Sequence, residues 1–126
     1  MSVISVDTRD RKPIYEQLTD NIKSLVLRGI LKPDEQLPGV RTLAVELAIN
    51  PNTISKAYAE LERGGIIYSV QGRGSFVTND VERLRALERE AILSEIENAL
   101  LRAKQLGTNK ADIAGLADKI WRNSND

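Results

Sequence analysis

The sequence predicts a mainly α-helical chain with one small β-hairpin, and three observations support this fold class. Apolar residues recur at the spacing of amphipathic helices in three segments between residues 13 and 65. Two runs of β-favouring residues, 66–70 and 76–78, then flank a turn that contains glycine. After Asn79 the helical spacing resumes in two further segments, which meet at Gly107. The expected order is therefore three helices, a hairpin and two helices.

The first predicted helix opens at Pro13 and stops near Gly29. The fixed φ and the missing N–H of a proline suit the first position of a helix. A connection over residues 30–38, which contains two prolines, then leads to the second helix. The apolar residues of the first helix are Ile14, Leu18, Ile22, Leu25 and Val26.

The second and third predicted helices are short and are joined by a tight turn. Gly39 is the expected N-cap of the second helix, whose apolar residues are Val40, Leu43, Ala44, Leu47 and Ala48. Asn50 is suited to cap the third helix, and Pro51 to begin it. A pair of glycines at 64 and 65 is expected to end it. The apolar residues of the third helix are Ile54, Ala57, Tyr58 and Leu61, with the Tyr58 hydroxyl expected at the surface.

The segment Gln71-Gly72-Arg73-Gly74 lies between the two β-favouring runs. Glycine supplies the positive φ of a tight turn, so this segment is expected at the tip of a hairpin. A helix, two short helices joined by a turn, and a hairpin make a winged helix-turn-helix, in which the hairpin is the wing. An arginine between glycines at the wing tip is able to enter a narrow minor groove, whose negative potential attracts its guanidinium.

The exposed face of the third helix is expected to begin with short polar side chains and one cation. Its residues are Asn52, Thr53, Ser55 and Lys56, and the first carboxylate after them is Glu60. The N-terminal half of this helix can therefore approach a polyanion without repulsion. A helix of this length fits a major groove about 12 Å wide.

The segment after Asn79 predicts two amphipathic helices. The first carries one apolar stripe made of Val81, Leu84, Leu87, Ala91, Ile92, Ile96, Ala99, Leu100, Ala103 and Leu106. Two helices of this length cannot cover such a stripe themselves, so a second subunit is expected to cover it. The alternative is that the tail folds back on its own winged domain. The residues expected in the homodimer interface are Leu84, Leu87, Ile92, Ile96, Leu100, Leu106, Ile113, Leu116, Ile120 and Trp121.

The composition excludes several kinds of site. The 126 residues include no cysteine and no histidine, which removes thiolate and imidazole chemistry, and no metal or other cofactor is expected. With 18 basic and 18 acidic residues the formal net charge is zero, so attraction to a nucleic acid must come from local patches. Ser55 beside Lys56 is the nearest catalytic pair, but adjacent helical residues point in different directions, and an enzyme is not expected. Without a signal peptide or a membrane span, a cytoplasmic location is expected.

Three motifs have distinctive spacing: Leu-Pro-x-x-Arg from Leu37, Asn-x-x-Thr-x-x-x-Ala-Tyr-x-x-Leu from Asn50, and Gly-x-Gly-Ser-Phe-Val from Gly72. Together with the preceding segment PIYEQLTDNIKSLVLRGILKPDEQLP, they closely resemble the DNA-binding domain of GntR-family bacterial transcription regulators, over roughly residues 10 to 78. The short two-helix tail resembles that of the YtrA-type subfamily. Pro51 stands where the family often has an arginine, so a base contact of some relatives is expected to be absent.

The resemblance implies which residues meet DNA. An arginine at the start of the second helix would grip a phosphate or a guanine edge, the third helix would contact bases and backbone, and the wing would line the minor groove. The expected DNA-binding residues are Arg41, Asn52, Thr53, Ser55, Lys56, Gln71, Gly72 and Arg73. The alternative for Arg41 is a salt bridge with an acid such as Glu46.

The expected organisation is a winged helix-turn-helix DNA-binding domain over residues 1–79 and a two-helix dimerisation region over residues 80–126. The expected function is sequence-specific binding of double-stranded DNA by a transcriptional regulator, with repression from a pseudo-palindromic operator bound by a homodimer. The alternative is a winged-helix adaptor that binds another protein and no DNA. Control by a small-molecule effector is left open.

Overall fold

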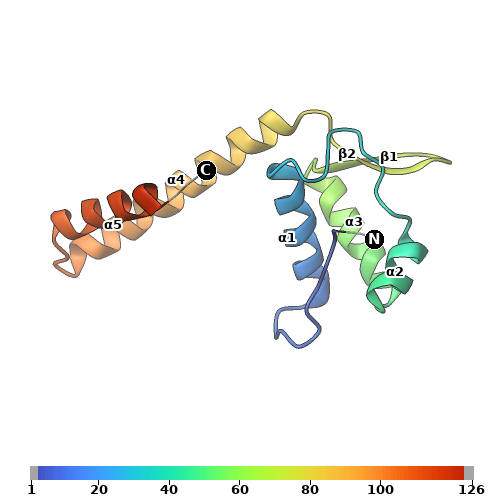
Figure 1. The fold of residues 1–126 in the computed structure, drawn as a ribbon, viewed down its shortest axis with the longest axis horizontal. Helices are drawn as coiled ribbons and strands as arrows, with labels where there is room; N and C mark the ends of the chain where they lie inside the picture. Colours follow the sequence, from blue (N-terminus) through green and yellow to red (C-terminus); the bar gives the residue numbers. More distant parts are fainter. Residues whose placement is uncertain (1–2, 124–126) are drawn as a thin grey trace. The chain divides into compact units, whose positions relative to one another are not determined.

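The computed structural model describes residues 3–123, which contain five helices and one two-stranded sheet (Figure 1). The elements are α1 (Ile14–Leu27), α2 (Val40–Leu47), α3 (Pro51–Arg63), β1 (Ile67–Val70), β2 (Gly74–Val77), α4 (Val81–Gln105) and α5 (Lys110–Asn123). This order of three helices, a hairpin and two helices confirms the predicted fold class.

The chain divides into two compact units, the first ending at Ala86 and the second beginning at Leu87. The boundary expected from the sequence, between residues 79 and 80, lies directly before α4 begins at Val81. The first residues of α4 therefore belong to the first unit. Residues 124–126 of the expected dimerisation region lie outside the described residues.

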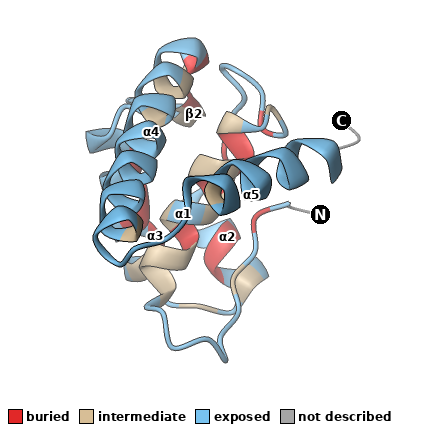
Figure 2. Cartoon of the chain, turned by 90° about the vertical axis from the view of Figure 1, so that its left-hand side faces the viewer, coloured by how far each residue is buried: buried red, intermediate tan, exposed pale blue. Residues whose placement is uncertain are grey.

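The first unit is built around the apolar faces of α1, α2 and α3. Leu18 and Ile22 of α1, Leu43 of α2 and Ile54 of α3 are each 0% exposed. The third helix packs against both of the others, and the buried segments drawn in red in Figure 2 lie mainly in these helices. The predicted helical spacing is confirmed in all three helices, because the residues that each helix buries were all among those predicted. Ala48, which was expected on the apolar face of the second helix, is instead exposed and lies just beyond the end of α2.

The helices begin and end close to the capping residues expected from the sequence, and only the start of α1 is shifted, by one residue. The side chain of Asn50 caps α3, and Pro51 is the first residue of that helix. After α3, Gly65 has a φ of +75°, the left-handed conformation that glycine adopts without strain. Pro13 has an extended ψ of 141°, so it caps α1 instead of opening it, and the helix begins at Ile14.

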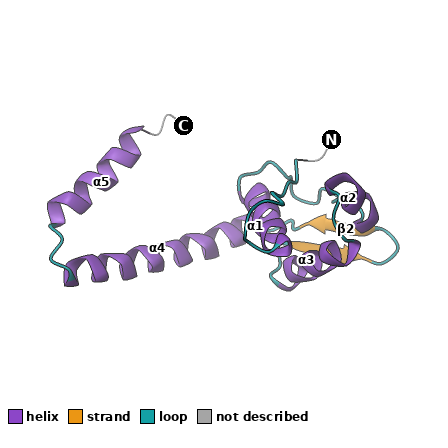
Figure 3. Cartoon of the chain, turned by 90° about the horizontal axis from the view of Figure 1, so that it is seen from below, coloured by secondary structure: helices purple, strands orange, loops and turns teal. Residues whose placement is uncertain are grey.

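The hairpin is antiparallel, and an aromatic pair lies across its two strands. Tyr68 of β1 lies opposite Phe76 of β2, with ring centroids 5.6 Å apart in a stacked arrangement. Figure 3 shows the two strands in orange, leading into the turn that joins them. Aromatic pairs of this kind stabilise antiparallel strands beyond their buried area.

The segment before α2 lies along the free edge of β2, an arrangement that the sequence did not predict. The N–H of Asp34 donates to the carbonyl of Val77 at 2.9 Å, and the N–H of Leu37 donates to the carbonyl of Ser75 at 2.8 Å. The N–H of Val77 in turn donates to the carbonyl of Glu35 at 2.9 Å. Residues 34–37 therefore act as a short third strand of the wing.

Tyr58 is a core residue, as expected, and its hydroxyl, which the sequence placed at the surface, is partly buried and bonded within the chain. The residue is 6% exposed, and its hydroxyl donates a hydrogen bond to the Pro38 carbonyl at 2.7 Å. Burial raises the pKa of this hydroxyl well above its usual value, and the negative charge of Glu46 adds to the rise. Because Pro38 directly precedes the N-cap of α2, this bond ties α3 to the start of α2.

The start of α4 is fastened to the first unit. Val81 is buried, and Leu84 packs half-buried against the core of that unit. Arg85 donates from Nε to the Leu27 carbonyl at 2.9 Å, which satisfies one of the free carbonyls at the end of α1. Leu84, which the sequence assigned to the dimer interface, is thus engaged with the core of its own chain.

The second unit has no core of its own in the part that is described. Between Leu87 and Asn123 no residue is buried, and Figure 2 draws this stretch almost entirely in the colour of exposed residues. The helices α4 and α5 diverge from the turn at Gly107, where φ is +80° (Figure 3). The most exposed large apolar side chains here are Leu106 at 86% and Trp121 at 76%.

The apolar side chains of α4 do not form the single stripe that the sequence predicted. A helix turns once in about 3.6 residues, so Leu87 and Ile96 lie on opposite sides of it. Leu93 and Leu101, which were not expected at an interface, are 66% and 52% exposed. The helix therefore presents apolar surface on more than one side.

Tyr58→Phe should lower the free energy of unfolding by about 1 kcal/mol, because it leaves the Pro38 carbonyl without its donor. Urea denaturation followed by circular dichroism measures the change. Tyr15→Phe is the matched control, since no hydrogen bond of the Tyr15 hydroxyl exists within residues 3–123; its change should stay within about 0.5 kcal/mol. Equal changes for the two variants would show that the Tyr58 bond contributes nothing.

Candidate nucleic-acid interface

The third helix presents a polar face from its first turn. Asn52, Ser55 and Lys56 are exposed on the side of α3 that faces away from its buried residues. The first turn contains no carboxylate, and the N-terminus of a helix carries a partial positive charge. Thr53 is half-buried at the edge of this face. The beginning of α3 is therefore suited to a negatively charged partner.

The ammonium group of Lys56 is held beside α1. Its Nζ lies 3.8 Å from the centroid of the Tyr15 ring, a cation–π contact. This contact places the positive charge at the α1 edge of the exposed face of α3. Sequence reasoning missed Tyr15 as a partner because the two residues lie on different helices.

Arg41 is the second residue of α2, and its side chain is exposed. Within the described part of the chain no ion pair joins it to Glu46 or to any other acid, so the salt-bridge alternative is wrong. Arg41, Val45 and Pro51 help to line an open hollow between α2 and the start of α3. A free guanidinium therefore stands next to the N-terminus of α3.

The wing tip consists of Gln71, Gly72 and Arg73, which are all exposed. The N–H of Arg73 closes the turn by donating to the Val70 carbonyl at 2.9 Å. Gly72 has a φ of +79°, which confirms the expected role of glycine in this turn. The Arg73 guanidinium forms no ion pair within residues 3–123, so it is free to meet a partner.

A side-chain hydrogen bond places the wing next to the exposed face of α3. Ser69 Oγ on β1 donates to Glu62 Oε1 on α3 at 2.8 Å. Glu62 follows Ser55 by two helical turns, so both lie on the same side of α3. The base of the wing therefore adjoins the C-terminal part of α3, on the side of the helix that also carries Ser55.

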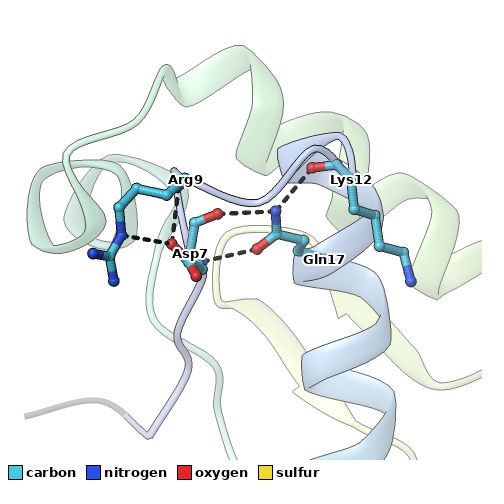
Figure 4. Close-up of polar contacts among 4 residues, drawn as sticks. All are labelled: Asp7, Arg9, Lys12 and Gln17. Carbon is cyan, nitrogen blue, oxygen red and sulfur yellow. Dashed lines mark hydrogen bonds and ion pairs between the residues drawn. The ribbon is translucent and has the colours of Figure 1, made fainter.

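A polar cluster before α1 was also missed by sequence reasoning (Figure 4). Gln17 accepts a hydrogen bond from the Asp7 N–H at 2.8 Å, and its Nε2 donates to the carbonyls of Asp7 and Lys12 at 3.0 and 2.8 Å. Arg9 Nε lies 3.5 Å from Asp7 Oδ1. These contacts order the segment that precedes α1, and no spacing rule predicts them.

The residues described by the structure include no group of three or more acidic, histidine or cysteine side chains that could hold a metal ion. None of the described helices is long and apolar enough to cross a membrane.

Comparisons with known proteins agree with this arrangement. Residues 14–77 match the bacterial regulatory proteins of the gntR family. Over 80 residues the chain is 49% identical to the HTH-type transcriptional repressor YtrA of Bacillus subtilis, a match that covers 64% of this chain and 62% of that repressor. The chain thus spans less than two thirds of the length of this relative.

Two solved structures extend the likeness to three dimensions. A GntR family transcriptional regulator from Listeria monocytogenes is 39% identical, with a TM-score of 0.73 over 87% of this chain and 96% of that one. The structure of AraR(DBD) in complex with operator ORX1 is 36% identical, with a TM-score of 0.50 over 52% of this chain and 80% of that one. These comparisons give no support to the alternative of an adaptor that binds no DNA.

Asn50→Ala should destabilise the first unit by about 1 kcal/mol, because the N–H of Asn52 loses the side-chain acceptor that lies at 2.8 Å. Urea denaturation measures the change. Asn52→Ala is the matched control, since only the backbone of Asn52 takes part in this bond; its stability should change by less than about 0.5 kcal/mol. A stable Asn50→Ala variant would contradict the capping role.

Proposed function

The chain belongs to the GntR family of bacterial regulatory proteins, and on this premise we propose that it represses transcription by binding a pseudo-palindromic operator as a homodimer. It is a DNA-binding transcriptional regulator, as its similarity to regulators of this family indicates. The observation that carries the proposal is the shared surface of α3 and the wing, which offers free polar and cationic side chains and no carboxylate in the first turn of α3.

In the proposed complex α3 enters the major groove with its N-terminus first. Asn52 and Ser55 hydrogen-bond to base edges or to the backbone, as amide and hydroxyl groups do in this groove, with Thr53 at the edge of the contact. Lys56 and Arg41 meet phosphates on either side of the helix. Phosphate contacts orient the protein, and base contacts supply the sequence preference.

The wing occupies the adjacent minor groove in this complex. Arg73 extends from the tip between two glycines, Gly72 and Gly74, so that no neighbouring side chain collides with the groove walls. Gln71 contacts the groove beside it. A narrow minor groove has an enhanced negative potential, which attracts the free guanidinium of Arg73.

A second copy of the chain covers the apolar surface of the second unit. Ile92, Ile96 and Leu100 of α4 are 44%, 47% and 42% exposed, and Leu116 and Ile120 of α5 are 57% exposed each. Exposed apolar surface of this extent is typical of an interface between proteins. Since α4 is apolar on more than one side, we expect the helices of the two copies to surround one another instead of meeting along a single seam.

The direction of control follows by similarity to a relative that is named a transcriptional repressor. A dimer on an operator that overlaps a promoter would block RNA polymerase. Such a protein acts where the bacterial chromosome lies, in the cytoplasm. A small-molecule effector of such a dimer would bind in a pocket where the subunits meet.

Selection of duplexes from a random library by the full-length protein, followed by footprinting, tests the proposal. The expected product is an inverted repeat whose half-sites are centred about 34 Å apart, one turn of B-DNA. Enrichment of single half-sites would refute the dimeric mode. The failure of any duplex to be enriched would refute the DNA-binding surface itself.

Arg41→Ala and Arg73→Ala should each weaken binding to the selected duplex by about 1–3 kcal/mol while the fold and the oligomeric state persist. Each change removes one cation that is free in the unbound protein. Fluorescence anisotropy at fixed salt measures the affinity, and circular dichroism serves as the folding check. Unchanged affinity in both variants would remove these residues from the interface.

Ile96→Glu should convert the dimer to a monomer with weak operator binding, because an interface cannot bury an unpaired carboxylate without a large desolvation cost. Analytical ultracentrifugation gives the mass. Lys119→Glu is the control: it places a carboxylate at an exposed position of α5 outside the predicted interface residues, with a larger change in net charge, and it should leave the dimer intact. A dimer that survives Ile96→Glu would place the interface elsewhere.

A further inference from the structure

One side chain from outside the hairpin reaches the wing tip. Gln36, in the segment before α2, donates from its Nε2 to the backbone carbonyl of Arg73 at 2.7 Å. The bond engages the carbonyl of Arg73 and leaves its guanidinium free. Gln36 thus contacts the backbone of Arg73 and leaves the positive charge of its side chain available for a partner.

The turn is shaped for this contact. Gly74 has a φ of +123°, and a Cβ at this position would lie 3.0 Å from Gln36 Nε2, closer than such atoms normally approach. A larger residue at 74 would therefore push the amide of Gln36 away from the turn. The glycine that follows Arg73 allows the backbone of the tip and the Gln36 side chain to come together.

The backbone that carries Gln36 is anchored on both sides. Gln36 itself forms a bridge with Phe76 of β2. Next to it, Leu37 is 3% exposed in the core. Two positions earlier, Asp34 Oδ1 accepts a hydrogen bond from the Tyr68 hydroxyl at 2.7 Å. The Gln36 side chain therefore starts from a fixed point on the edge of the sheet.

We propose that Gln36 is a positioning residue, which holds the turn at the wing tip in the conformation from which Arg73 enters the minor groove. This inference rests on the proposed function, since it assigns Gln36 a role in the DNA contact of the wing. A two-stranded hairpin is only marginally stable by itself, and its exposed turn is its least constrained part. A binding loop that must be ordered on association loses affinity, so a turn that is already ordered binds more tightly. An amide also suits this position because it adds no negative charge next to DNA.

A double-mutant cycle on the full-length protein tests this role. The four proteins are the wild type, Gln36→Met, Arg73→Ala and the double variant, and the probe is the duplex that the wild type selects from the random library. Methionine keeps the length of the side chain and removes the donor. Gln36→Met should weaken binding about fivefold in the wild-type background, the range expected for one hydrogen bond. In the Arg73→Ala background the same change should have almost no effect, because the group that it positions is gone.

Hydrogen exchange of the Arg73 amide in the free protein gives a second readout that does not involve DNA. Gln36→Met should speed this exchange, since the turn closed by the Arg73 N–H and the Val70 carbonyl opens more often. Gln105→Met is the matched control for this readout: it makes the same substitution at an exposed position at the end of α4, and it should leave the exchange rate of the Arg73 amide unchanged.

The outcomes separate the two proposals. Faster exchange, together with a loss of affinity that depends on Arg73, supports the positioning role. The positioning role is overturned if the affinity losses of the two single variants multiply in the double variant, or if Gln36→Met leaves the affinity unchanged. Either result leaves the proposed function intact. If the wild type selects no duplex, both proposals fail together.

Discussion

The burial of one side of α3 is the constraint on which the rest of the first unit depends. Ile54, Ala57, Tyr58 and Leu61 all face the core that α3 shares with α1 and α2. Because the apolar residues of α3 are packed into this core, the opposite side of the helix is polar and exposed. The side chains of Asn52, Ser55 and Lys56 are thus presented by packing, and the rigid core holds them in fixed relation to α2.

The segment from residue 34 to residue 38 connects the parts of the DNA-binding surface. Its backbone pairs with β2, its Gln36 side chain reaches the wing tip, and its Pro38 carbonyl accepts the Tyr58 hydroxyl of α3. The segment then enters α2, which carries Arg41. A connection that in sequence only separates two helices therefore relates the wing, α2 and α3 to one another. In the role that we propose, Gln36 of this segment contributes to recognition without contacting DNA.

The second unit differs from the first in that its apolar side chains are exposed. Its described residues bury none of their side chains, although α4 and α5 expose leucines, isoleucines and a tryptophan. Such surface is unfavourable in water, and a second copy of the chain supplies the missing apolar partner in the function that we propose. Dimer formation would then be coupled to the order of these helices. The same coupling would make operator affinity depend on the concentration of the protein.

The sequence by itself determined the number and order of the elements, the caps at Asn50 and Gly65, and the tight turn at Gly72, because these features arise from spacing and backbone preferences within a few residues. Only the tertiary structure decided that Gln36 reaches Arg73, that Tyr58 donates to Pro38, and that Lys56 lies over Tyr15. It also decided that Leu84 packs against the core of its own chain. The physical reason is that each of these contacts depends on how separate elements pack together, and packing brings close residues whose positions in the chain follow no period.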